Sequence, residues 1–181
     1  MRKRSGFTVI ELIIVIVILG ILTTIGIPSY LHWLPKYRLK SAARDLYSNM
    51  QLAKLSAIKN NANWAIVFNR ATGQYQVCSG QGPDNSWGGG DNVVLKTVVL
   101  NNYRSGVTYG HGNAGSAIGS TFGDDITYSS PNNVAVMNPR GTSNAGYVYL
   151  QNSRATTSYG IGTRSSGVII LRRWDGAGWV H

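Results

Sequence analysis

The chain has 181 residues, of which 13% are charged and 22 are glycine. It is too apolar for a disordered protein and too rich in glycine for an all-helical one. A single cysteine, Cys78, excludes an internal disulfide and does not indicate a redox compartment. The formal net charge is +10, but three of the 17 basic residues form a cluster at positions 2–4. That cluster flanks an apolar run, where basic residues mark the cytoplasmic side of a membrane rather than nucleic-acid binding.

Residues 7–27 read FTVIELIIVIVILGILTTIGI and contain one charged side chain, Glu11. At about 1.5 Å per residue, a helix of this length spans roughly 30 Å, the thickness of a bilayer core. A secretory signal has a shorter apolar core that ends in a small-residue cleavage site. Here the small residue, Gly6, precedes the apolar run. Cleavage after Gly6 would therefore leave the membrane-spanning helix on the mature protein.

Glu11 needs an explanation, because a carboxylate in an apolar membrane helix costs about 2–3 kcal/mol or more. A cation would offset that cost, and cleavage after Gly6 would create one at the α-amino group of Phe7 in a neighbouring chain. Alternatively, Glu11 lies at the level of the lipid headgroups, since it is only one turn into the span. The sequence leaves both interpretations open.

Residues 3–12, KRSGFTVIEL, resemble the class III signal of type IV prepilins and type II secretion pseudopilins. The resemblance implies that a membrane-bound prepilin peptidase cuts after Gly6 and methylates the new amine of Phe7. It also implies that Glu11 pairs with the N-terminus of an adjacent subunit during assembly. The expected partners are thus other pilin or pseudopilin subunits, the prepilin peptidase and the inner membrane, and no cofactor is expected.

Beyond the span, apolar residues recur at steps of three and four, which predicts an amphipathic helix that continues to about residue 60. Pro28 and Pro35 are expected to kink this helix or break it locally, and Gly20 and Gly26 to weaken it. The expected core-facing stripe consists of Leu39, Ala42, Ala43, Leu46, Met50, Ala53 and Ala57.

The remainder reads as strands and turns. Trp64, Ile66 and Phe68 should share one face of the first strand. A tight turn is expected over residues 173–179, with Trp174 and Trp179 covering the core. The predicted strands are 64–68, 74–78, 93–100, 126–128, 134–137, 147–150 and 168–172.

These elements predict an α+β fold, in which a long N-terminal α-helix, half transmembrane and half amphipathic, packs on a C-terminal antiparallel β-rich head. The expected segments are a cleaved leader (1–6), an assembly helix (7–27), its amphipathic continuation (28–60) and a periplasmic head (61–181).

Segments 38–46, 50–58 and 64–68, together with 138–141 and 167–174, resemble the GspH/FimT group of minor pilins and pseudopilins. The resemblance implies the pilin fold and a low-abundance subunit that primes or tips a type IV pilus or a type II secretion pseudopilus. It also implies a single-pass inner-membrane protein with a cytoplasmic N-terminus. Many major pilins close a C-terminal loop with a disulfide, which the single cysteine excludes here.

DNA binding is the alternative function. Some FimT-type minor pilins capture DNA for natural transformation through a Gly-Arg-x-Arg motif, but residues 167–170 here read GVII. The remaining candidate contacts are Arg164, Arg172 and Arg173. From residue 61 onward there are 8 basic and 5 acidic residues, a net charge of +3. Strand alternation would place Arg172 and Arg173 on opposite faces, which favours ordinary solvated arginines.

Enzymatic activity is not predicted. The chain contains no Gly-x-Ser-x-Gly, His-x-x-x-His or Cys-x-x-Cys motif. His111, Asp124 and Asp125 could form a carboxylate–histidine site, although a pair of solvated loop residues is the favoured interpretation. A calcium site would have to draw on Asp84, Asp91, Asp124 and Asp125, whose spacing is irregular, so no metal is predicted.

Overall fold

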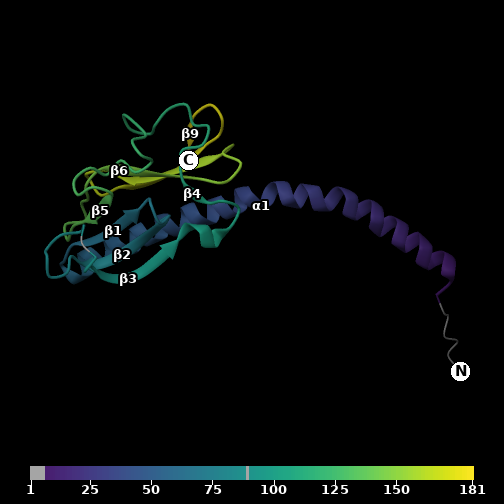
Figure 1. The fold of residues 1–181 in the computed structure, drawn as a ribbon, viewed down its shortest axis with the longest axis horizontal. Coiled ribbons are helices and arrows are strands. Elements are labelled where there is room, and N and C mark those ends of the chain that lie inside the picture. Colours follow the sequence, from purple (N-terminus) through teal and green to yellow (C-terminus); the bar gives the residue numbers. More distant parts are fainter. Residues whose placement is uncertain (1–6, 89) are drawn as a thin grey trace, which may run out of the picture. The chain divides into compact units, whose positions relative to one another are not determined.

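The computed structural model describes residues 7–88 and 90–181. A single long helix, α1 (Val9–Asn60), precedes the strands (Figure 1). The contacts divide the chain into two compact units, Met1–Leu34 and Pro35–His181. The second unit contains the end of α1 and every strand, and it therefore holds the whole hydrophobic core.

Helix α1 is continuous through Pro28 and Pro35, so of the two outcomes expected at these prolines, a kink or a local break, the break is wrong. The stretch 20–28 is helical as well. A proline removes one backbone donor, while the hydrogen bonds on either side of it can hold the remaining turns in place. The stripe of seven residues from Leu39 to Ala57 is completely buried, which confirms the predicted core-facing side. Leu52, Leu55 and Ile58 lie on the other side of the helix and are exposed.

The first sheet consists of β1 (Trp64–Asn69), β2 (Gln74–Gly80), β3 (Val93–Val99) and β5 (Val134–Met137). Its strands are antiparallel in the order β3-β2-β1-β5. Trp64, Ile66 and Phe68 belong to the core shared with α1, as predicted. On the opposite face, Ala65 and Cys78 form a small second cluster under Trp87. Burial raises the pKa of the Cys78 thiol to about 11, so this cysteine is an unreactive core residue.

The second sheet consists of β4 (Thr108–Tyr109), β6 (Gly146–Gln151), β7 (Ser158–Thr163), β8 (Ile169–Trp174) and β9 (Trp179–Val180), in the order β4-β6-β7-β8-β9. A short 3₁₀ helix, η1 (Leu100–Tyr103), follows β3 and precedes β4, the first strand of this sheet along the chain. This sheet is antiparallel too, so the α+β prediction is confirmed.

Three parts of the second sheet differ from the sequence-based prediction. The segment 126–128 makes only an isolated bridge, between Ile126 and Val148. Strands β4, β7 and β9 were not predicted. The turn predicted over 173–179 is shorter than expected, since Trp174 pairs with Trp179 and their rings lie 5.5 Å apart. In β7 two glycines hide the strand pattern, and a Cβ at Gly162 would collide with the Gly146 carbonyl oxygen.

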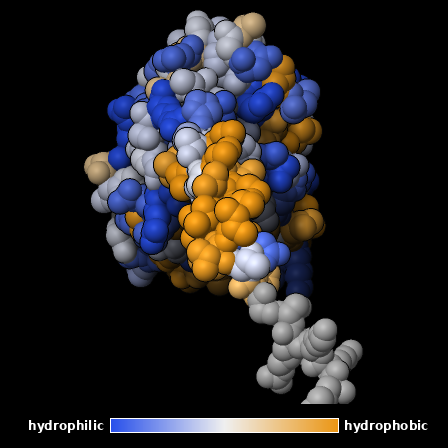
Figure 2. All heavy atoms as spheres, turned by 90° about the vertical axis from the view of Figure 1, so that its right-hand side faces the viewer, coloured by the Kyte–Doolittle hydropathy of each residue, from blue (hydrophilic) through white to orange (hydrophobic). Residues whose placement is uncertain are grey.

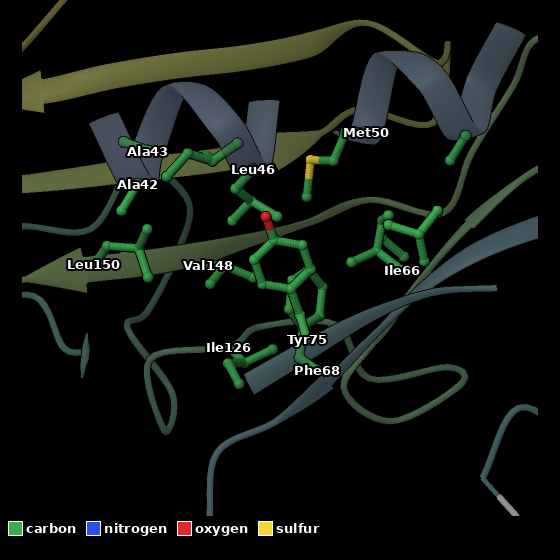
Figure 3. Packing of buried hydrophobic residues seen from close by; sticks show 14 of the residues in the cluster. Ala42, Ala43, Leu46, Met50, Ile66, Phe68, Tyr75, Ile126, Val148 and Leu150 are labelled. Atoms are coloured by element: carbon green, nitrogen blue, oxygen red, sulfur yellow. The ribbon is translucent and has the colours of Figure 1, made fainter. Parts of the chain in front are cut away.

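The core lies where α1 meets strands of both sheets (Figure 3). The Tyr75 hydroxyl points from β2 toward the helix, where Asn49 donates to it over 2.8 Å. Burial raises the pKa of Tyr75, although the Asn49 hydrogen bond acts in the opposite direction. This buried polar pair favours one rotation of α1 above the first sheet, because breaking it would leave the buried Tyr75 hydroxyl without this partner.

We expect the segment Pro35–His181 to fold without the preceding helix, because it forms one compact unit with a complete core. Produced alone, it should be soluble and monomeric, and it should unfold cooperatively. Size-exclusion chromatography and thermal unfolding followed by near-ultraviolet circular dichroism would check this. Persistent aggregation at neutral pH would contradict it.

In that segment, Leu46→Ala should lower the free energy of unfolding by about 2–5 kcal/mol, since it removes a fully buried side chain from the centre of the core. The matched control is Leu55→Ala on the same helix, where the side chain is 64% exposed. Its effect should stay within about 0.5 kcal/mol. Urea denaturation measures both values. Equal losses would mean that the burial of the stripe does not hold the head together.

Candidate processing and assembly site

The start of α1 is fixed by reciprocal hydrogen bonds between Thr8 and Glu11. The Thr8 backbone N–H and hydroxyl donate to Glu11 Oε2 over 3.1 and 3.0 Å. The Glu11 backbone N–H donates in turn to the Thr8 hydroxyl oxygen over 3.3 Å. This arrangement is a capping box, in which the N-cap residue and the third helical residue satisfy each other's backbone donors. Glu11 therefore has a local structural role that the sequence analysis missed, although the Thr-x-x-Glu spacing signals it.

The capping box leaves part of the Glu11 carboxylate available. Its hydrogen bonds all go to Oε2, so within the described residues Oε1 has no hydrogen-bond partner. The side chain is exposed, and Phe7, one residue before the cap, is 82% exposed. Gly6 lies outside the described residues. The geometry can thus accept a cation at Oε1 without disturbing the helix cap, whether that cation is an amine of another chain or a group at the membrane surface.

The helix that follows is apolar and uncovered. It is long and apolar enough to cross a membrane, and no residue in its most apolar window is buried within the protein. Apolar side chains gather into one continuous surface when the molecule is viewed from the N-terminal side (Figure 2). The hydroxyls of Thr23 and Thr24 are satisfied inside the helix, by the carbonyl oxygens of Leu19 and Gly20 at 2.9 and 2.8 Å. Such a surface requires lipid or other apolar helices around it.

The three candidate DNA contacts do not form one patch. Arg172 lies in register with Gly160 and Arg173 with Tyr159, so strand alternation directs the two arginine side chains to opposite faces of β8, as expected, although both residues border one groove. Strand β9 is only two residues long and pairs with Arg173 and Trp174, which leaves the edge of β8 open beside Arg172. Arg164 lies in the turn before β8, at the other end of that strand. Of the residues at the arginine positions of the DNA-binding motif, Ile170 is buried and Val168 is exposed.

Lys40 and Arg44 of α1 also line the groove; the sequence marks them as basic residues of the helix but does not place them beside β8. Their spacing of one helical turn placed them on a single face of the helix. No pattern in the sequence indicated which strand that face would approach.

The pair His111 and Asp125 comes together, but in a structural arrangement. Asp125 is buried, forms an ion pair with Arg70 at 2.9 Å, and lies within hydrogen-bond distance of His111 Nδ1 at 2.6 Å. Phe122 stacks on the His111 ring at 4.0 Å between centroids. Asp124 is exposed and takes no part in this cluster. The cluster ties the β1–β2 turn to the loop between β4 and β5, and the Asp125 carboxylate is engaged within it.

Asp84 and Asp91 lie in one loop, where Asp91 Oδ2 accepts from the Asp84 N–H over 3.2 Å. In the described part of the chain, no group of three or more His, Cys, Asp or Glu residues is placed to hold a metal ion. Asp125 is already engaged by Arg70 and His111. The four aspartates considered for calcium are therefore divided between separate places in the head.

Two family models match the chain. The model described as type II transport protein GspH matches residues 42–167, well over half of the chain, and the prokaryotic N-terminal methylation motif matches residues 1–27. The chain resembles prepilin peptidase-dependent protein D of Escherichia coli K12, with 38% identity over 60 residues, 33% of this chain and 41% of that protein. It also resembles a fimbrial protein of Moraxella nonliquefaciens, with 30% identity over 96 residues, 53% of this chain and 52% of that protein.

The chain thus spans about half, or less, of the length of these two relatives. No solved structure matches it. The long N-terminal helix, the antiparallel head and both family models agree with one another. The chain therefore belongs to the GspH family of type II transport proteins, a structural family of pilin-like subunits, and is not an enzyme.

Proposed function

We propose that this protein is a minor pilin or pseudopilin, a subunit that primes or tips a type IV pilus or a type II secretion pseudopilus. Before assembly it is held in the inner membrane by residues 7–27, with the N-terminus cytoplasmic and the head periplasmic. The observation that carries the proposal is the uncovered apolar helix, which begins at a capping box that contains its single carboxylate. A helix of this kind is suited first to lipid and then to a bundle of identical or related helices.

The names of the two relatives support the same assignment. One is described as dependent on prepilin peptidase and the other as fimbrial, and the methylation motif spans the predicted cleavage position. The basic residues at positions 2–4 support a cytoplasmic N-terminus.

The priming or tip position rests on the resemblance to minor subunits. Immunogold labelling of sheared filaments would test it, since a tip subunit gives one label per filament end and a bulk subunit labels the whole length.

Processing gives the first test of this function. In cells with an active prepilin peptidase, the mature chain should begin at an N-methylated Phe7, because cleavage after Gly6 removes the six-residue basic leader. Intact-mass spectrometry of the membrane-extracted protein measures this. Gly6→Val should accumulate the uncleaved chain, since a branched side chain obstructs the position before the scissile bond, and Gly6→Ala should do so less. A wild-type chain that retains Met1 would refute the proposal.

Glu11 gives the second test, because its two roles can be separated by substitution. Glu11→Gln keeps an oxygen acceptor for the Thr8 N–H and removes the charge, whereas Glu11→Val removes both. Neither change should impair membrane insertion, since each makes the span less polar. If the carboxylate pairs with an amine of a neighbour, both variants should be about tenfold depleted from filaments, equivalent to about 1.4 kcal/mol. The amount of each variant in membrane and filament fractions is measured by immunoblotting.

Normal incorporation of Glu11→Gln together with depletion of Glu11→Val would show that helix capping, and not the charge, is what assembly requires. Normal incorporation of both variants would show that assembly needs neither role of Glu11.

A further inference from the structure

Strand β3 forms an open edge of the first sheet (Figure 1). It is seven residues long, and no other strand among the described residues pairs with its outer side. The side chains of Val93, Val94 and Leu95 are 55%, 41% and 58% exposed, so the edge is apolar as well as open. An edge of this kind is a template for pairing with another chain, unless the protein covers or blocks it.

The other sheet edges in the described chain are covered or shorter. At β5 the Asn144 side chain stands in for a neighbouring strand, since it accepts from the Val136 N–H and donates to the Val134 carbonyl oxygen, each over 2.8 Å. At β6, strand β4 and the bridge from Ile126 occupy the outer side. Strand β9 is two residues long and leaves residues 169–172 of β8 open. Strand β3 therefore presents the longest open edge in this part of the chain.

The pairing of β3 with β2 determines which of its backbone groups face outward. The Leu100 N–H donates to the Gly73 carbonyl oxygen over 2.9 Å, and the register between the two strands is regular from Lys96 to Val99. In an antiparallel ladder, residues that bond to the partner strand alternate with residues that do not. The N–H groups of Thr97 and Val99 and the carbonyl oxygen of Thr97 therefore point away from β2. None of them has a hydrogen-bond partner within the described residues.

A hollow of about 280 Å³ lies beside the second half of β3. It is lined by residues 96–99 of the strand and by Asn102 and Tyr103 of η1. Four consecutive strand residues alternate between the two faces of the sheet, so a hollow that all of them line lies along the edge. Strand addition combines main-chain hydrogen bonds with pockets for alternate side chains. The outward backbone groups and the hollow beside them supply both.

Strand β3 runs beside the last part of α1 and in the opposite direction. Lys96 Nζ donates to Asn49 Oδ1 over 3.4 Å, and farther along the chain the Tyr103 hydroxyl donates to Asp45 Oδ2 over 2.5 Å. The contacts move toward the start of α1 as the chain moves forward from β3 into η1. The open edge therefore lies close to α1, the helix that carries the proposed assembly site.

This direction argues against a second copy of the chain as the occupant. Antiparallel pairing of two β3 strands would turn one α1 opposite to the other, whereas copies held in one membrane by residues 7–27 enter their heads in the same direction. Parallel pairing is less stable per residue. The open residues of β8 in a second copy include Arg172 and adjoin Arg173, so pairing them with β3 would bring like charges near Lys96.

We propose that the β3 edge receives an extended segment of a different subunit of the filament, which joins the first sheet as a further strand. The inference rests on the proposed function, since it requires assembly with other pilin-like subunits. An extended backbone satisfies the outward groups of Thr97 and Val99 in the spacing of a strand ladder. A helix cannot do so, because its backbone groups are already paired with one another. Apolar side chains on alternate residues of the segment would cover Leu95 and fill the hollow.

Photochemical cross-linking of filaments tests which chain lies at the edge. The photoreactive amino acid p-benzoylphenylalanine replaces Leu95 in the full chain, and mass spectrometry identifies the peptide that is joined to it after irradiation. We expect a peptide of a different pilin-like subunit. The control position is Val168, which lies just before β8 and has a similar exposure of 52%. It should not capture the same peptide.

A proline at position 97 tests the backbone contact. Thr97→Pro removes an outward N–H and no hydrogen bond to β2, and proline is tolerated where the N–H of an edge strand faces outward. This variant should be about tenfold depleted from filaments, whereas Thr97→Ala, which keeps the N–H, should assemble as the wild type. Both variants should keep the unfolding temperature of the wild-type chain in detergent. Lys96→Pro, which removes a hydrogen bond to β2, should lower that temperature.

The outcomes separate the two proposals. A wild-type chain absent from filaments would overturn the proposed function. If the wild-type chain is present, three results would each overturn the edge assignment alone: no cross-link from position 95, a cross-link only to a second copy, or normal assembly of Thr97→Pro. If Thr97→Pro lowers the unfolding temperature, Leu95→Lys decides instead, because it keeps every backbone donor and places a charge on the apolar edge. It should be depleted about tenfold, and its normal assembly would overturn the assignment.

Discussion

The head depends on one contact, the burial of the small-residue stripe of α1 against both sheets. Ala42, Ala43, Ala53 and Ala57 allow the helix backbone to approach the strands closely, while Leu46 and Met50 fill the centre of the core. Neither sheet could hide its inner face without the helix, because each has only four or five short strands. The Asn49–Tyr75 hydrogen bond then selects one rotation of the helix among those that would bury the stripe.

This contact also gives the helix two different surfaces along its length. Past Pro35 one side is buried and the other carries Lys40, Arg44 and exposed leucines. From Phe7 to Trp33 every residue is exposed, and Leu34 is half-buried. A soluble monomer would not retain so long an apolar surface, since it would aggregate. The helix is therefore built to be covered by something other than its own head, in agreement with the family to which the chain belongs.

The sequence was informative where the pattern was local and periodic. The stripe at steps of three and four identified the core face of α1, and the apolar run 64–68 with its two-residue period identified β1 and its inner residues. It failed where tertiary contacts decided the outcome. Strand β7, with the sequence SYGIGT, alternates Tyr159 and Ile161 with two glycines, which are depleted in strands. These glycines are required by the close approach of Ile118 and Tyr147 rather than by local preference. The helix runs through Pro28 and Pro35 even though helix propensity favours a break there.

The candidate sites also differ in whether the sequence alone could identify them. The signal around Gly6, Phe7 and Glu11 is contiguous in sequence and could be recognised without a structure, and so could the capping box, from its spacing alone. The basic groove could not, since Lys40 and Arg173 are separated by most of the chain and line one groove only because β8 packs beside α1. The alternation rule did separate Arg172 from Arg173, in agreement with their register against β7.

The start of α1 combines a charged group with an apolar surface. A carboxylate is held by its own helix cap, with one oxygen left without a hydrogen-bond partner in the described chain. The apolar helix that follows it has no charged side chain up to residue 27. Charged contacts add little affinity when exposed, but they reject wrong registers strongly, because like charges brought together are costly. A featureless apolar helix can slide along its neighbours at little cost. A single negative site at its beginning would therefore fix how far along the filament each subunit stops.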